Sequence, residues 1–155
     1  MIIKGTIMTT LDIRKKISTR INAMPDSKRM LLSVLCYVDG LSKNPFQDQY
    51  DLLYKLQDNW DGYGAPKISD TAINNCKNIT QKLPQSVYDS VEILPTEYGG
   101  VQLKRTLNDG GIVSCDFGDE TMSYYVEHPN FKPEFFSFLD YNDANIQTLT
   151  NYLTA

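Results

Sequence analysis

Apolar and polar positions follow two different periods along this chain, and the change between them comes near Pro84. Before it, apolar residues recur every three to four positions, which predicts helices over about residues 9–24, 25–41, 45–60 and 69–83. After it, apolar residues alternate with polar ones between turns, which predicts strands near residues 91–94, 101–104, 112–117 and 121–127. Asn142 or Asp143 then caps a last helix. Helices followed by strands are typical of an α+β domain, so we expect N-terminal helices, a four-stranded antiparallel meander and a C-terminal helix.

The stretch 131–139 fits two structures. Pro129 and Pro133 interrupt it, and a proline within a strand pattern restricts that strand to the edge of a sheet. Its phenylalanines form either a fifth strand at the edge or an aromatic plug; they are Phe131, Phe135, Phe136 and Phe138. The sequence leaves both alternatives open, so the meander has four strands or five.

Length and composition favour one soluble globular domain. The chain of 155 residues is 41% hydrophobic and 22% charged, which is ordinary for a packed fold. We expect 1–155 to be a single domain in which 45–155 forms the α+β core. Residues 1–44 are then a helical appendage or a partner-binding hairpin.

The helix expected over 25–41 carries an apolar arc that is wider than a surface hairpin needs. Such an arc either enters the main core or packs against another protein. We therefore expect a protein partner, or a second copy in a homodimer, to bind through the N-terminal helices. The candidate contact residues are Met30, Leu31, Val34, Tyr37 and Val38.

Charge and hydropathy argue against several classes of partner. The net charge of −4 is spread along the chain without a basic block, so we do not expect nucleic-acid binding. A nucleic-acid surface would have to use Arg14, Lys15, Lys16, Arg20, Lys28 and Arg29. No apolar run approaches the roughly 18 residues of a membrane span, and residues 1–7 are too polar for a signal peptide. We expect no membrane association and a cytoplasmic location, with translation starting at Met1 or at Met8.

Residues with distinctive chemistry are few. Cys36, Cys76 and Cys115 are widely spaced without a Cys-x-x-Cys pair, and His128 is the only histidine. This inventory predicts no disulfide framework, no metal site and no cofactor. Cys36 and Cys76 fit apolar helix faces, and a lone histidine in a loop is more often solvated than catalytic. We therefore assign no catalytic residue.

The densest motif runs from Leu56 to Pro66 and holds the only tryptophan. In a structural interpretation, Trp60 buries a large area and Asp61 accepts hydrogen bonds from the amides of Tyr63 and Gly64, which fixes a corner between two helices. In a functional interpretation, Trp60, Asp61 and Tyr63 lie at the mouth of a ligand-binding pocket together with Glu97. Asp61 and Glu97 would then be a carboxylate pair for acid–base chemistry, although no nucleophile accompanies them.

Two resemblances to known families rest on particular segments. The segment from Ile17 to Leu41, a helix, Met24-Pro25 and an amphipathic helix, resembles the helical segment of small bacterial antitoxin-like proteins. A second resemblance covers about residues 52–127 and is to an uncharacterised family of small prokaryotic proteins. It rests on Asn59-Trp60-Asp61-Gly62-Tyr63-Gly64-Ala65-Pro66, the helix 69–83, Leu83-Pro84, Ile93-Leu94-Pro95-Thr96 and Gly99-Gly100-Val101-Gln102-Leu103. That family often has an acidic and an aromatic residue after the second strand, where this chain has Lys104-Arg105, which puts an acidic site there in doubt.

Three classes of function remain. We favour a non-enzymatic protein-binding module of the bacterial toxin–antitoxin, immunity or phage-defence type, because of the apolar arc, the acidic balance and the absence of a catalytic set. The alternative is a small-ligand-binding protein or an unrecognised hydrolase with a site near Trp60, Asp61, Tyr63 and Glu97. The third class, nucleic-acid binding, has the least support.

Overall fold

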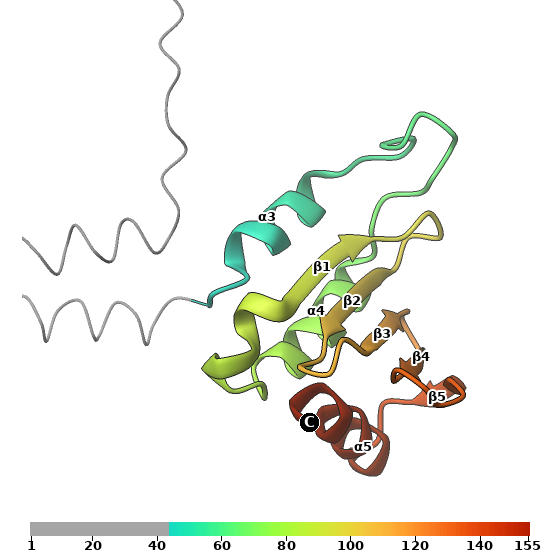
Figure 1. Ribbon diagram of the computed structural model, residues 1–155. Helices are drawn as coiled ribbons and strands as arrows, with labels where there is room; N and C mark the ends of the chain where they lie inside the picture. Colours follow the sequence, from blue (N-terminus) through green and yellow to red (C-terminus); the bar gives the residue numbers. More distant parts are fainter. Residues whose placement is uncertain (1–43) are drawn as a thin grey trace, which may run out of the picture. The chain divides into compact units, whose positions relative to one another are not determined.

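A computed structural model describes residues 44–155 of the chain. The chain divides into two units, Met1–Asn44 and Pro45–Ala155, and the fold below is that of the second. The helices expected over 9–24 and 25–41 lie outside the described residues, as do Met30, Leu31, Val34, Tyr37 and Val38. The described elements (Figure 1) are α3 (Gln47–Lys55), α4 (Asp70–Thr80), the 3₁₀ helix η1 (Gln85–Ser90), β1 (Val91–Pro95), β2 (Val101–Thr106), β3 (Ile112–Phe117), β4 (Thr121–Glu127), β5 (Glu134–Asp140) and α5 (Asp143–Thr154).

The strands form one antiparallel meander in the order β1-β2-β3-β4-β5. The α+β prediction is confirmed, and β5 decides between the two alternatives for 131–139 in favour of an edge strand. A register shift between Met122 and Tyr124 interrupts the β4–β5 pairing, and Phe138 takes a φ of 56° there. An irregular edge strand pairs poorly with other sheets.

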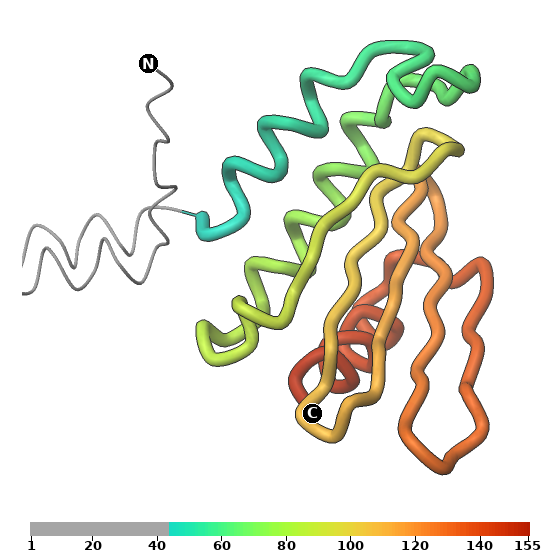
Figure 2. The backbone as a smooth tube through the Cα atoms, turned by 45° about the horizontal axis from the view of Figure 1, so that its top comes forward, coloured from blue at the N-terminus to red at the C-terminus, as the bar shows by residue number. Residues whose placement is uncertain are grey.

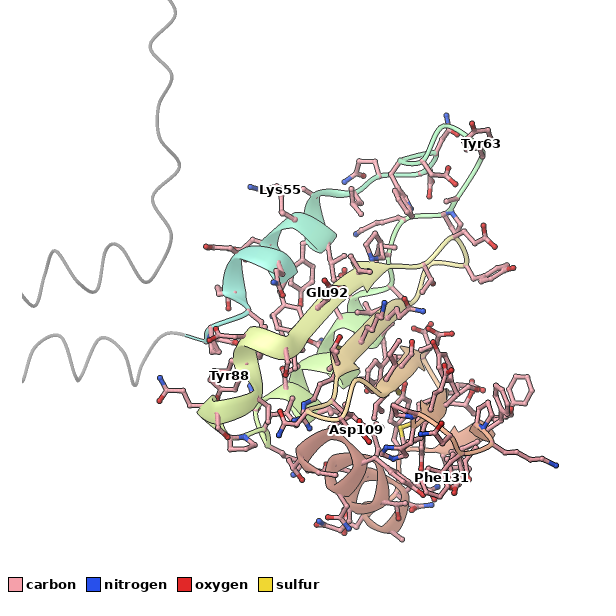
Figure 3. The ribbon with its side chains drawn as sticks, in the orientation of Figure 1. Lys55, Tyr63, Tyr88, Glu92, Asp109 and Phe131 are labelled. Atoms are coloured by element: carbon pink, nitrogen blue, oxygen red, sulfur yellow. The ribbon has the colours of Figure 1, made fainter. Side chains whose placement is uncertain are left out.

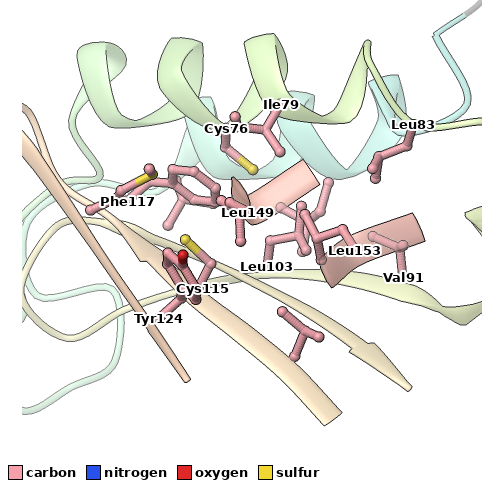
Figure 4. Close-up of a cluster of buried hydrophobic side chains, with 14 of the residues drawn as sticks. Cys76, Ile79, Leu83, Val91, Leu103, Cys115, Phe117, Tyr124, Leu149 and Leu153 are labelled. Carbon is pink, nitrogen blue, oxygen red and sulfur yellow. The ribbon is translucent and has the colours of Figure 1, made fainter. Parts of the chain in front are cut away.

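One face of the sheet carries the core. Buried residues of this face alternate with exposed or half-buried ones along β1, β2 and β4, as the sequence predicts, whereas three consecutive residues are buried in β3. Figure 2 shows α4 and α5 on the same side of the strands. Cys76 and Ile79 of α4 and Leu149 and Leu153 of α5 belong to the same buried cluster as Leu103 and Cys115 of the sheet (Figure 4). The expected core face is confirmed for Ala72, Ile73, Cys76 and Ile79, which are buried in α4. Leu83 is buried too, but it follows the end of the helix at Thr80.

Helix α3 ends at Lys55, so the prediction of a helix reaching Trp60 is wrong. Leu56 already has an extended backbone. Asp58 and Asn59 cause the early end, because their side chains accept hydrogen bonds from Lys67 N at 2.8 Å and from Gly64 N at 2.8 Å. Short polar side chains that bond nearby backbone groups compete with helix formation.

Arg105 fixes α5 against the sheet. It lies in β2 on the covered face and is 3% exposed. Its guanidinium donates to the carbonyl of Leu153, to that of Ala155 at 3.1 Å and to Ser90 Oγ at 3.3 Å. A cation at the C-terminal end of a helix also complements the helix dipole. The Lys104-Arg105 pair, which departs from the resembled family, therefore includes a structural arginine.

Candidate functional site

The corner loop, residues 58–67, connects α3 to α4 and is closed by hydrogen bonds across its base. The backbone N–H of Asn59 donates to the carbonyl of Ala65 at 2.7 Å. The Asn59 side chain accepts from the N–H of Gly64 at 2.8 Å. Asn59 takes a left-handed φ of 64°, a conformation that asparagine tolerates better than most residues. The loop is therefore built from its own polar groups.

Asp61 fixes the middle of the corner loop. Its Oδ1 accepts from the N–H of Tyr63 at 2.8 Å and from that of Ala65 at 3.0 Å. The N–H of Gly64, expected to bond Asp61, donates at 2.8 Å to Asn59 Oδ1 and has only a weaker interaction with Asp61. The hydrogen bonds from the amides of Tyr63 and Ala65 lower the pKa of Asp61, since they stabilise the ionised form. The carboxylate thus has the structural role of an Asx-type turn.

Trp60 anchors the corner loop to the body of the domain. Its ring is half-buried and packs against the core, and its Nε1–H donates to the carbonyl of Pro66 at 3.1 Å. A partly buried indole whose N–H is satisfied within the loop is a structural support.

Tyr63 differs from its neighbours because its side chain is 95% exposed. It lies at the tip of the corner loop and points away from the domain (Figure 3). The bonds of Asn59, Trp60 and Asp61 therefore support a backbone that presents one aromatic side chain to solvent.

The β1–β2 turn lies beside the corner loop, as Figures 1 and 2 both show. The carbonyl of Gly99 accepts from Ser69 N at 2.8 Å. A Cβ at Gly99 would lie 3.1 Å from the Lys67 carbonyl oxygen and the residue has a φ of 83°, so both the close approach and the backbone favour glycine. This contact fixes a second exposed aromatic, Tyr98, which is 84% exposed. We call Tyr63, Tyr98 and the hollow beside Tyr98 the tyrosine surface.

The hollow of the tyrosine surface has a volume of about 260 Å³. It is lined by Pro66, Lys67, Ser69, Tyr98, Gly99, Gly100, Gly118 and Asp119. Ser69 Oγ donates to Asp119 Oδ1 across it. The predicted site residues Trp60, Asp61, Tyr63 and Glu97 do not line it. Glu97 accepts a hydrogen bond from the Tyr98 hydroxyl, which raises the pKa of Tyr98. The pairing of Glu97 with Asp61 stays a prediction.

The only histidine has a carboxylate partner that the sequence interpretation missed. His128 Nδ1 lies 2.8 Å from Asp109 Oδ2. The register that pairs Ile112 with Glu127 brings the β2–β3 turn next to His128. The expected hairpins that share the strand 112–117 turn at Gly110-Gly111 and at Gly118-Asp119. Aligning the strands from these two turns would have given the Asp109–His128 pair from the sequence.

Cys76 and Cys115 are buried thiols of the core. Burial raises the pKa of Cys76 to about 12 and that of Cys115 well above its ordinary value. At neutral pH both are protonated, and neither acts as a nucleophile without a large change of structure. The interpretation of Cys76 as a core residue is confirmed.

Two further features concern only residues 44–155. In this part of the chain, no group of three histidine, cysteine or acidic side chains is placed to hold a metal ion. No helix of the same part has both the length and the apolar character that a membrane crossing requires.

No family model, no curated protein and no solved structure matches this chain. The two family resemblances therefore stay predictions.

Proposed function

We propose that the chain is a non-enzymatic protein-binding module and that the tyrosine surface is its contact site in the α+β domain. One observation carries this proposal: Tyr63 is 95% exposed at the tip of a loop whose backbone is held by Asn59 and Asp61. The hydrogen bonds of Asn59 and Asp61 hold the backbone below this ring, so the ring is presented on an ordered loop, and its exposed face adds nothing to the core. Binding a partner would bury that face.

A rigid exposed tyrosine suits protein recognition for two physical reasons. Tyrosine has only two side-chain torsions, so holding it in an interface costs little conformational entropy, and its ring buries a large area. A loop that is already ordered loses little further freedom on binding, so more of the contact energy appears as affinity. Tyr98 adds a second ring on a turn that is fixed to the corner loop by Gly99.

The setting we propose is a toxin–antitoxin, immunity or phage-defence system of a bacterial cytoplasm. The net charge of −4 favours a basic partner. The antitoxin-like resemblance of Ile17 to Leu41 supports the same setting, and the apolar arc of Met30, Leu31, Val34, Tyr37 and Val38 supplies a second contact site, to the partner or to a second copy.

The alternative, a small-ligand-binding protein or hydrolase that uses Trp60, Asp61, Tyr63 and Glu97, has less support. Asp61 Oδ1 is occupied by two backbone amides and Trp60 Nε1 by a carbonyl. Acid–base catalysis by Asp61 would therefore compete with the bonds that hold the loop.

Affinity capture followed by calorimetry tests the proposal. A partner recovered from the source cells with the tagged chain is purified, and its dissociation constant is measured with the wild type, Tyr63→Ala and Phe135→Ala. Phe135 is the matched control, because it is an exposed aromatic (72%) in β5. We expect Tyr63→Ala to weaken binding by about tenfold or more and Phe135→Ala to leave it unchanged. Equal affinities of the wild type and Tyr63→Ala would exclude the tyrosine surface.

A further inference from the structure

A second hollow lies at the other end of the sheet. It has a volume of about 300 Å³ and is lined by Val126, His128, Phe131, Lys132, Glu134 and Tyr152. These residues come from the end of β4, the β4–β5 connection, the start of β5 and α5. Figure 3 shows Asp109 and Phe131 at this end, far from Tyr63. We call it the β4–β5 hollow, and its size is at the lower end of the range for small-molecule sites.

His128 is oriented in the β4–β5 hollow by a residue outside the lining. Asp109 Oδ2 lies 2.8 Å from His128 Nδ1, and Asp109 Oδ1 accepts from the N–H of Gly111 at 2.8 Å. The carboxylate is therefore held on both oxygens. An ionised partner on Nδ1 keeps the proton on that nitrogen and leaves Nε2 available to a ligand.

Glu134 is oriented by Tyr152 of α5. The Tyr152 hydroxyl donates to Glu134 Oε2 at 3.0 Å, and the Tyr152 ring lies among the aromatic rings of Tyr124 and Phe136. Two ionisable groups of the lining, His128 and Glu134, are thus each fixed by a second contact. Such support is what a preorganised binding site needs.

The lining carries two opposite charges that are not paired with each other. Among residues 44–155, Lys132 and Glu134 form no ion pair; the close pairs there are Lys67–Asp70 and His128–Asp109. Lys132 is positive and Glu134 is negative, so the lining carries both signs of charge. The apolar part of the lining comes from Val126 and from Phe131, whose ring is 75% exposed.

We propose that the β4–β5 hollow binds a small zwitterion of the amino-acid type with an apolar side chain. The ligand carboxylate faces Lys132, its ammonium group faces Glu134 and donates to His128 Nε2, and its apolar group packs on Phe131 and Val126. A singly charged ligand is less suitable, because an anion leaves Glu134 without a partner and a cation leaves Lys132 without one. This site is separate from the tyrosine surface and does not depend on it.

NMR titration of the full chain near neutral pH tests the class of ligand. The probes are phenylalanine, 3-phenylpropionate, which lacks the ammonium group, and 2-phenylethylamine, which lacks the carboxylate. We expect phenylalanine to shift the ring signals of His128 and Tyr152 in a saturable way and to bind about tenfold more tightly than either analogue. No saturable shift at these residues would overturn the site, and equal affinity for 3-phenylpropionate would overturn the zwitterion assignment.

Charge-removing variants test the assigned contacts. Glu134→Gln keeps an oxygen that accepts the Tyr152 hydrogen bond, and Lys132→Met keeps the length of the side chain. Each is expected to weaken phenylalanine binding by about tenfold, and Glu134→Gln is expected not to weaken 3-phenylpropionate. Glu120→Gln, an exposed change in the β3–β4 turn, is the control and leaves all affinities unchanged. Unchanged phenylalanine affinity in Glu134→Gln, or an equal loss in Glu120→Gln, would contradict the assignment.

Discussion

The Asp61 carboxylate accepts a hydrogen bond from the backbone N–H of Tyr63 at 2.8 Å, so an acidic side chain fixes the backbone of the residue that is 95% exposed. This relationship joins the two interpretations of the corner motif. Asp61 and Trp60 have structural roles, and the loop that they support carries Tyr63 to the surface. The motif is therefore both a structural corner and the base of a proposed contact site.

Two substitutions of Asp61 distinguish its effect on the order of the corner loop from the effect of its negative charge. Asp61→Asn retains an oxygen that accepts from the amides of Tyr63 and Ala65, whereas Asp61→Ala removes it. We expect amide hydrogen exchange at Tyr63 and Ala65 to be much faster in Asp61→Ala and close to that of the wild type in Asp61→Asn. Partner binding should weaken in Asp61→Ala alone. A loss of binding in Asp61→Asn with normal exchange would instead assign the charge a direct role.

The Asp109–His128 pair predicts a defined dependence of stability on pH. The hydrogen bond with His128, and then that from Gly111, lowers the pKa of Asp109 below its ordinary value of 3.8. A lowered folded-state pKa stabilises the fold above the unfolded-state pKa, and this contribution is lost as the pH falls through the folded-state value. Denaturation midpoints of the wild type and Asp109→Asn should therefore differ near neutral pH and converge below pH 3.8. A difference that persists or grows as the pH falls below 3.8 would contradict the direction of the shift.

The position of α5 on the core predicts a large cost for shortening Leu149. This side chain is fully buried and belongs to the same cluster as residues of α4 and the sheet. Leu149→Ala should lower the free energy of unfolding by about 2–5 kcal/mol, because it removes apolar contact and leaves a cavity. The same change at Leu52, which is 63% exposed in α3, should cost less than about 1 kcal/mol. Urea denaturation measures both, and comparable losses would mean that α5 does not pack as described.

We expect substitutions of Arg105 and of its neighbour Lys104 to differ in their effect on stability. Arg105→Met removes the donors to the carbonyls of Leu153 and Ala155 and leaves the buried Leu153 carbonyl without this partner, which costs about 1–3 kcal/mol. Lys104 lies on the opposite face of β2 and is half-exposed, so Lys104→Met should have little effect on stability. Hydrogen exchange in the last turn of α5 should rise only in Arg105→Met. Equal behaviour of the two variants would exclude the proposed attachment of α5.

Much of the fold follows from local sequence patterns. Alternation of apolar residues predicts β1 to β4, and the Ser69 and Asn142 caps predict the starts of α4 and α5 because each accepts a backbone N–H of the first turn. The end of α3 was missed, since apolar spacing continues through Leu56 while Asp58 and Asn59 bond the loop instead. The strand β5 stayed open because its prolines and phenylalanines fit both alternatives.

The candidate sites were less accessible to prediction. Tyr63 was identified from its motif, but its exposure depends on hydrogen bonds that only the folded loop shows. Tyr98 and the Asp109–His128 pair depend on contacts between segments that are distant in sequence. The close approach of Gly99 to Lys67 places the turn that carries Tyr98. The β3–β4 register brings Asp109 and His128 together. Periodicity within one segment carries no information about either.

Site-specific photo-crosslinking tests the central claim most directly. A benzophenone amino acid is placed at position 63, at position 98 or, as a control, at position 135, and each full-length chain is irradiated in the cells of origin. We predict one discrete crosslinked protein from positions 63 and 98, the same protein in both, and none from position 135. Absence of any adduct from position 63, or the same adducts from all three positions, would contradict a protein-binding role for the tyrosine surface.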